Sequence, residues 1–378
     1  MRRTLRILIL STLFLIPEAG ASVDRLAVLG GLSQPLLDDS NSFIFPATLN
    51  EWPRFEVELF DDWAGLAYPL SPQHTLGLFF NRPTPELATL NETISQNGSD
   101  LFRALSPSPW LDLAYSYTPK PGLSLGTSVA LAYDRNTQGP RTASVVNSDF
   151  RLGMRVGRSR GPALDLTLGI LFHQLQDQTP EETSPSEDAQ AGLNIDIRYR
   201  WPFNSRLTLL PYFGFISDIF ALGSEEKHQT SVRFGTGLHV TPAHGVLLIA
   251  ALDSRYEQTR YSISQHQVRE DKSLWLPNWI LGGEVQVGSM IFRLGTRHET
   301  WFGDHEQLHS NQWVQSSSFT TNFSTHLGLG LEFGNLLLDG LLERDFLRDG
   351  PHILGGSRHG GGILSHLSLT YRFNQPSE

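Results

Sequence analysis

Two short segments of the sequence contain residue types that could bind ions. His305 and His309 stand four positions apart in a polar stretch, and this spacing suits a metal ion only on a helix that offers a third ligand. Gly355–Gly362 is glycine-rich, as anion-binding loops are, but no helix follows it. We therefore predict two surface loops, with no metal site and no bound cofactor.

A larger set of charged residues recurs at every second position of otherwise apolar segments. Because successive side chains of a strand point to opposite faces, this spacing predicts strands with one apolar face and one charged face. Both signs occur in strand after strand, which favours a ladder of paired charges over an ion filter of one sign. The set comprises Arg151, Arg155, Asp165, Asp196, Arg198, Arg200, Arg233, Asp253, Arg255, Arg293, Arg297, Glu332 and Arg372.

The clearest strands are residues 191–201 and 363–373. In the second, Leu367, Leu369, Tyr371 and Phe373 alternate with polar residues. Strict alternation excludes a parallel strand that is buried on both faces. Taken alone, such a strand fits a half-buried strand of a soluble sandwich equally well.

The connections between predicted strands decide between these architectures. Short turns alternate with long polar connections, and the strands between them are longer than those of a sandwich. Short turns at one end and long loops at the other are typical of a transmembrane β-barrel, and no fixed repeat points to a propeller. The predicted long loops are residues 81–107, 135–145, 176–188, 220–229, 258–273, 303–316 and 348–361.

The fold class predicted is therefore all-β, an antiparallel transmembrane barrel. Hydrocarbon cannot satisfy unpaired backbone groups, so the sheet must close, and the final strand must pair with the strand near residues 54–60. The apolar faces then meet lipid, and the charged faces line a wet lumen. Counting gives 16 strands, or 14 if the strand near residue 55 belongs to the preceding segment.

The N-terminus carries an export signal. Arg2, Arg3 and Arg6 precede the apolar residues 7–16, and a small-x-small cleavage site ends at Ala21. The apolar run is too short for a retained membrane anchor, and the sequence has no Cys, so disulfides do not stabilise the protein. Together with the barrel pattern, this signal predicts the outer membrane of a Gram-negative bacterium, with its lipids and the barrel-assembly machinery as partners.

The charge balance excludes one class of partner. The full chain has a net charge of −10, and the predicted signal carries three Arg and one Glu, so the mature chain is at about −10 − 2 = −12. Nucleic-acid binding needs a basic face, so we expect no nucleic acid as a partner.

Residues 22–53 lack strand alternation and form a separate N-terminal segment. Its Gly pair, its acidic turn at Asp38 and Asp39 and its Pro46-Ala47-x-Leu run resemble the N-terminal segment of FadL-like outer-membrane proteins and their PorV-type relatives, with Phe45 in place of their Asn. The resemblance implies a 14-stranded barrel in which this segment plugs the lumen. The alternative is a lead-in that packs at the periplasmic mouth. The last strand similarly resembles the C-terminal assembly signal of outer-membrane barrels.

We predict four regions: a signal peptide (1–21), the plugging segment (22–53), the barrel (54–374) and a short tail (375–378). The FadL-like resemblance implies a transport channel for a small, possibly hydrophobic, molecule of unknown identity. The alternatives are a non-transporting barrel for surface interaction or secretion assembly, and a lipid-modifying enzyme. Ser368 with His366, and Ser324 with His326, share strand faces, but no nucleophile motif surrounds them, so we predict no catalytic residue.

Overall fold

A computed structural model of the chain describes most of the region after the predicted signal peptide. The described residues are 23–29, 31–59, 62–82, 104–158, 161–178, 186–222, 225–263, 266–309, 312–342 and 364–373, with Thr84, Leu87, Leu90, Asn91 and Ile94 between the third and fourth ranges. The predicted signal peptide, the C-terminal tail and Gly355–Gly362 lie outside them. Within these ranges, no helix is long and apolar enough to cross a membrane.

In the described part of the chain, three short helices precede the sheet and 16 strands follow them. The helices are α2 (Val23–Val28), α3 (Asn41–Ile44) and the 3-10 helix η1 (Pro46–Glu51). The strands are β1 (Arg54–Glu58), β2 (Trp63–Ser71), β3 (His74–Phe80), β4 (Ser108–Lys120), β5 (Leu123–Gln138), β6 (Arg141–Gly157), β7 (Ala163–Gln178), β8 (Ser186–Asn204), β9 (Leu207–Leu222), β10 (Glu225–Ala243), β11 (Val246–Ile263), β12 (His266–Val287), β13 (Met290–His309), β14 (Gln312–Phe333), β15 (Leu336–Leu342) and β16 (Leu364–Arg372).

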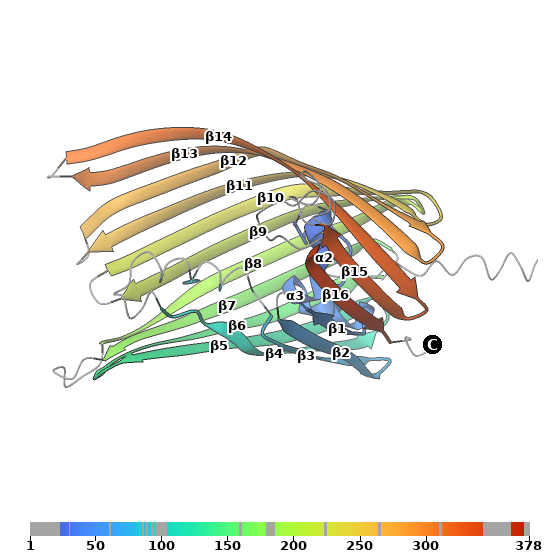
Figure 1. Cartoon of the computed structure of the whole chain (residues 1–378), viewed down its shortest axis with the longest axis horizontal. Coiled ribbons are helices and arrows are strands. Elements are labelled where there is room, and N and C mark those ends of the chain that lie inside the picture. The colour runs from blue at the N-terminus through green and yellow to red at the C-terminus, as the bar shows by residue number, and fades with distance from the viewer. Residues whose placement is uncertain are drawn as a thin grey trace, which may run out of the picture.

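The strands form one closed antiparallel barrel in sequence order, and β16 returns to β1 (Figure 1). The closing register runs from Arg54 opposite Arg372 to Glu58 opposite Ser368. Just beyond it, the Phe373 N–H donates to the Pro53 carbonyl at 3.1 Å. The prediction of 16 strands closed between the first and the last is confirmed, and the alternative of 14 is wrong. Phe55–Glu58 belongs to the barrel because β1 pairs on both sides, with β16 and with β2.

Burial in the barrel is inverted relative to a soluble protein, and β8 shows this most clearly. Asp196 and Arg198, which point into the lumen, are 6% and 1% exposed, whereas Leu193 and Trp201, on the opposite face, are 37% and 49% exposed. Charged side chains buried inside and large apolar side chains exposed outside are the arrangement that a hydrocarbon exterior requires. The barrel is therefore a transmembrane one.

Four of the predicted long loops are largely strand in their described residues, and so are the described ends of a fifth. Residues 135–145, 220–229, 258–273 and 303–316, and both ends of 176–188, continue the hairpins, so that β12 and β14 each reach 22 residues. The predictions for these segments were wrong because they relied on hydrophobic alternation. A hairpin with water on both faces needs no such alternation, since neighbouring backbones still pair. Residues 348–361 lie outside the described ranges.

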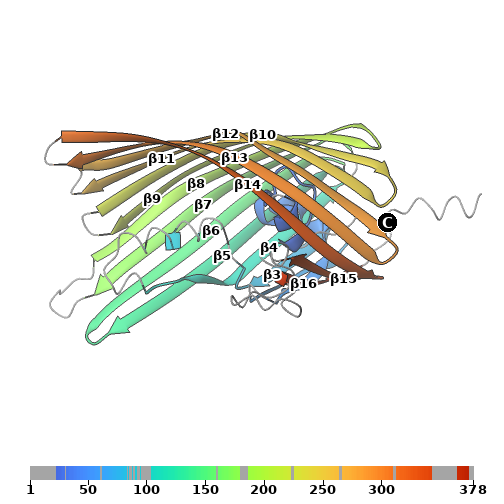
Figure 2. The same cartoon turned by 45° about the horizontal axis from the view of Figure 1, so that its top comes forward.

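The long hairpins continue well beyond the membrane. A strand of 22 residues extends roughly 70 Å, whereas about 9 to 11 tilted residues cross a bilayer. Figure 2 shows β5 to β14 projecting far past the short strands β15 and β16. On the outward face of this projection, Arg260 and Lys272 both contact Glu270, at 2.9 and 2.8 Å. The Arg260 and Lys272 side chains are 54% and 38% exposed, so this part of the wall is a charged, water-facing surface. The hydrogen bond from Lys272 lowers the pKa of Glu270 to about 2.

Candidate functional site: the lumen and its N-terminal segment

The described part of the N-terminal segment (residues 23–29 and 31–53) lies inside the barrel. Figure 1 shows α2 and α3 within the end of the barrel that β1 and β16 close, and η1 packs against β4, β5 and β6. Leu29, Leu36, Phe45 and Leu49 are each at most 2% exposed. The residues expected to mark this segment are buried there too: Asp38, Asp39, Pro46 and Ala47.

Glycines on the lumen face make room for this segment. A Cβ atom at Gly126 would overlap the backbone of Pro46 and Ala47, and one at Gly295 would overlap the Val28 carbonyl. Gly237 is similarly close to Pro35, and Gly328 to the Val28 side chain. Glycine is used where two backbones must approach closely. The inner wall is thus shaped to the N-terminal segment on several strands.

An ionic cluster fixes α2 to one side of the wall. The Arg25 guanidinium contacts Glu284 of β12 at 2.9 Å, and Arg293 of β13 contacts the same carboxylate at 2.6 Å. Arg293 also pairs with Asp339 of β15. All four side chains are at most 6% exposed. Because isolated charges are costly in such surroundings, these four groups stabilise one another as a unit.

Arg198 of β8 holds the middle of the N-terminal segment. One amino group, Nη1, donates to the Leu36 carbonyl at 2.9 Å and to the Asn41 side-chain oxygen at 2.6 Å. The other, Nη2, donates to Asp165 at 2.8 Å, and the guanidinium carbon lies 4.6 Å from the centre of the Phe45 ring. A planar guanidinium can serve all these partners at once, whereas a lysine could not.

Further contacts secure the rest of the N-terminal segment to the wall. Arg151 donates to the Phe43 carbonyl at 3.3 Å, Arg233 to the Gln34 side chain at 3.3 Å, and the ring of His239 contacts the Pro35 carbonyl at 2.9 Å. Arg155 pairs with Glu51 at the end of η1. Asp39 contacts Arg54 of β1 at 3.3 Å. The contacts are therefore spread around the barrel circumference.

The predicted charged residues also interact with main-chain groups and with one another along the lumen wall. Arg200 donates to main-chain carbonyls of the turn at Arg158 and Gly161, and Asp196 is buried beside Gly214. The remaining pairs are Arg233 with Asp253 at 2.8 Å, Arg255 with Glu257 at 3.2 Å, Arg297 with Glu299 at 2.5 Å and Arg372 with Glu332 at 3.0 Å. Charges of opposite sign thus meet in pairs along the inner wall.

Several residues that hold the N-terminal segment were not among those predicted from the sequence. Arg25, Asn41 and Glu51 come from that segment, and Arg54 and His239 come from the strands. Arg25 and Glu51 could have been found from the sequence, because each is a charged residue in an otherwise apolar N-terminal stretch that lacks strand alternation. No local signal distinguishes a lumen glycine from a turn or bulge glycine.

The stretch from Asn81 to Pro107 was predicted as a polar loop, but part of it packs inside the barrel. Leu87, Leu90 and Ile94, which follow helical spacing, are each at most 5% exposed. They form one cluster with apolar lumen-facing residues of β5, β6, β7 and β9: Ala132, Ala143, Val145, Leu175 and Phe220. The inner wall is therefore apolar beyond the charged region that holds the N-terminal segment.

A buried hydrogen bond lies beside this apolar cluster. His173 of β7 contacts Asp218 of β9 at 2.9 Å, and the His173 ring is 4.7 Å from that of Phe220. The contact passes over β8 at Gly192, where a Cβ would lie 2.9 Å from the Asp218 carboxylate carbon and closer still to one of its oxygens. Gly192 therefore permits the bridge between two strands that are not neighbours.

Replacing Gly192 by alanine is expected to destabilise the barrel by about 1–3 kcal/mol, because the added methyl group overpacks the site and displaces Asp218 from His173. The measurement is the urea concentration at the midpoint of unfolding in detergent, with unfolding monitored as the loss of the compact band on an unheated gel. The control is Gly283→Ala on the outer face of β12, where the nearest atom to a Cβ is at 3.4 Å. Equal midpoints for the two variants would contradict the expectation.

The histidine and serine residues singled out from the sequence lie on three different strands: β13, β14 and β16. His305 lies in β13 and pairs with Asp271 of β12, and His309 is the last residue of β13. Among the described residues, no group of three or more His, Cys, Asp or Glu side chains is arranged to hold a metal ion. His326 with Ser324 lies on β14, and His366 with Ser368 on β16.

Comparison with known proteins gives structural likenesses only. No family model and no curated protein matches the chain. Among solved structures, the alcaligin receptor FauA from Bordetella pertussis shares 9% identity over 85% of this chain and 75% of its own, with a TM-score of 0.40. The monoaromatic hydrocarbon channel TodX shares 13% over 85% and 100%, and the channel CymD 9% over 96% and 100%, each with a TM-score of 0.39. These structures are outer-membrane receptors and channels.

The architecture itself indicates where the protein resides. Sixteen antiparallel strands close without an edge, the outer surface is apolar, and the inner surface carries paired charges. At the end where β1 starts and β16 finishes, every connection is short, with two residues in six hairpins and five between β6 and β7. The long connections, between β3 and β4 and between β15 and β16, lie at the other end, so the first end is the periplasmic one. The chain is an outer-membrane β-barrel.

Proposed function

We propose that this protein is a transport barrel for a small hydrophobic molecule, and that the N-terminal segment plugs its lumen and must move for passage. The observation that carries the proposal is the fit between wall and segment. Lumen glycines leave space for its backbone, and two arginines from opposite sides of the barrel bind it: Arg198 on β8 and Arg54 on β1. A lead-in at the mouth of the barrel would need neither feature.

The hydrophobic nature of the cargo is inferred from the apolar cluster of the lumen. A polar solute gains nothing from Val145, Leu175 and Phe220, whereas a molecule with apolar surface is stabilised by contact with them. Leu87, Leu90 and Ile94 occupy that wall in the present structure. We propose that cargo replaces these contacts before it reaches the N-terminal segment.

A disulfide lock tests whether the N-terminal segment gates the lumen. A Cβ at Gly282 would lie 3.8 Å from the Leu29 Cβ, the mean separation in disulfides, and the sequence has no other Cys. In proteoliposomes carrying the Leu29→Cys/Gly282→Cys variant, entry of a hydrophobic fluorescent probe should stop on oxidation and resume on reduction. The two single-cysteine variants are the controls, since they cannot form this disulfide and probe entry should be the same in their oxidised and reduced states. Equal entry in the oxidised and reduced states would refute gating by this segment.

A barrel for surface interaction or secretion assembly is the second candidate. It is supported by the wall that projects beyond the membrane, where residues 312–323 of β14 are exposed. If this candidate function is correct, a secreted protein co-purifies with the barrel, and trimming the β13–β14 hairpin abolishes this co-purification without changing probe entry. If the protein is only a transport barrel, no secreted protein co-purifies with it before or after trimming.

A further inference from the structure

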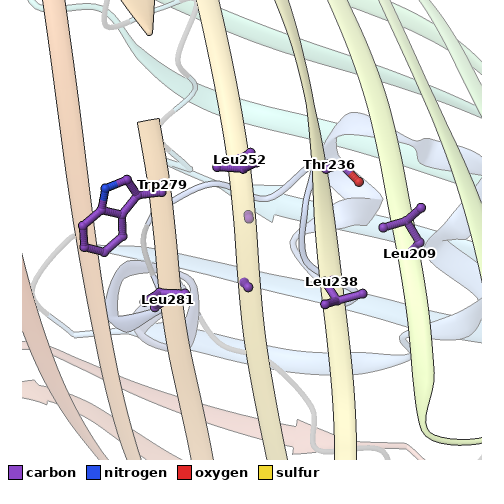
Figure 3. A pocket seen from close by; sticks show the side chains of 8 residues that line it. Leu209, Thr236, Leu238, Leu252, Trp279 and Leu281 are labelled. Carbon is purple, nitrogen blue, oxygen red and sulfur yellow. The ribbon is translucent and has the colours of Figure 1, made fainter. Parts of the chain in front are cut away.

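The outer surface of the barrel carries an apolar groove over β9 to β12 (Figure 3). Its volume is about 470 Å³, within the range of small-molecule sites. Thr236 and Ala250 have short side chains, and the longer side chains around them enclose the space that this leaves. These longer residues are Leu238, Leu252, Trp279 and Leu281.

The register shows how the groove is built. Leu238, Ala250 and Leu281 lie directly opposite one another on β10, β11 and β12. The next outward row contains Thr236, Leu252 and Trp279. The short residue is therefore on β11 in one row and on β10 in the other, and the depression crosses the strands obliquely between two leucines.

The groove lies within the lipid-facing belt. Leu252 and Leu281 are 56% and 51% exposed, and the exposed residues Leu248 and Val285 lie on the same outward faces of β11 and β12. No polar surface lines the groove, so water cannot fill it favourably inside a bilayer. Its natural occupant is a hydrocarbon chain, and the continuity of the groove with the belt gives such a chain access from the membrane.

The position of the groove identifies the leaflet. Ala250 is four residues from the start of β11 at Val246, and Leu281 is six from the end of β12 at Val287. With tilted strands, these residues stand roughly 10 to 15 Å above the periplasmic turns. The occupant therefore comes from the periplasmic leaflet.

A cationic residue lies at the foot of the groove. Arg206 is exposed in the turn between β8 and β9, three residues before Leu209 of the groove lining. Its carbonyl accepts a hydrogen bond of 2.8 Å from the Thr241 N–H, which places the turn beside β10. A guanidinium at the membrane–water boundary is suited to bind a phosphate.

We propose that this groove is a specific site for one phospholipid of the periplasmic leaflet, with an acyl chain over Thr236 and Ala250 and the phosphate at Arg206. The inference does not rest on the proposed transport function. A lipid held here differs from the surrounding bilayer because it is bound in a shaped cavity as well as by the general apolar surface.

Retention of lipid through purification tests the proposal. Wild-type protein and an Ala250→Phe variant are extracted in mild detergent, and bound phospholipid per chain is counted by native mass spectrometry. We expect one retained phospholipid in the wild type and about tenfold less in Ala250→Phe, whose ring fills the groove. Ala191→Phe is the matched control, since Ala191 is exposed on the outer face of β8 opposite Phe172. It should retain lipid as the wild type does.

The phosphate contact at Arg206 and the acyl-chain contact in the groove are tested by separate variants. Arg206→Gln should weaken the rebinding of added phosphatidylglycerol and leave that of diacylglycerol unchanged. Compact migration on unheated gels verifies folding, and Leu281→Ala, which removes a wall of the groove, should also lower retention if Ala250→Phe does not assemble. Equal retention in the wild type and the groove variants overturns the proposal. So does a wild-type dimer that Ala250→Phe dissociates, because a second copy would then occupy the groove.

Discussion

Deleting residues 23–51 is expected to raise the passive permeability of the reconstituted barrel to small sugars by on the order of tenfold or more. The segment occupies the lumen between β4–β6 on one side and β13–β16 on the other. Its removal opens the lumen, and water can fill this space because charged side chains and glycines line it. Liposome swelling in arabinose measures the effect.

The deletion has an internal control, because β1 begins only at Arg54 and the seam with β16 is left intact. Compact migration on unheated gels should therefore persist. A synthetic peptide of residues 23–51, added to the deleted barrel, should restore part of the block. Unchanged swelling in a correctly closed barrel would mean that other residues seal the lumen, and the plug proposal would then be wrong.

Replacing Arg293 by methionine is expected to destabilise the barrel by about 3–5 kcal/mol. Arg293 is 1% exposed and pairs with both Glu284 and Asp339. Without it, Asp339 loses this partner in a buried position, and Glu284 retains only Arg25 of the two arginines. The free energy of unfolding in urea, followed by tryptophan fluorescence in detergent, measures the loss.

The control for this prediction is Arg297→Met on the same strand. The Arg297 and Glu299 side chains are each 26% exposed, so water compensates for the lost pair, and the expected change is at most about 1 kcal/mol. A double change of Arg293→Met and Asp339→Asn should recover part of the stability, since it also removes the buried Asp339 charge that Arg293 neutralises and keeps the pair of Arg25 with Glu284. Similar losses for Arg293→Met and Arg297→Met would contradict the account.

The barrel itself could be predicted from the sequence because its signal is local. Alternation along residues 191–201 places Asp196 and Arg198 on one face and Leu193 and Trp201 on the other, whatever the neighbouring strands are. A closed sheet then follows from the inability of hydrocarbon to satisfy backbone groups. The closing pairing of the last strand with the strand near Phe55 follows from the same reasoning.

The height of the wall could not be predicted in this way. Beyond the membrane, both faces of residues 258–273 and 303–316 meet water, so no alternation of polarity marks them as strand. Their extended form depends on pairing with the adjacent strand, which is a tertiary property. The groove over Thr236 and Ala250 is of the same kind, because a small residue forms a cavity only beside larger ones on neighbouring strands.

The membrane barrel and the lumen side of residues such as Arg198 and Arg293 follow from the sequence, because the alternation of polar and apolar residues is contained within each strand. The choice between 16 and 14 strands, and the partners of those side chains, depend on contacts between distant parts of the chain. Arg198 meets Leu36 and Asn41, and Gly295 faces Val28, across separations of more than 150 residues. Such contacts arise when the barrel closes around the N-terminal segment, and they leave no mark in local spacing.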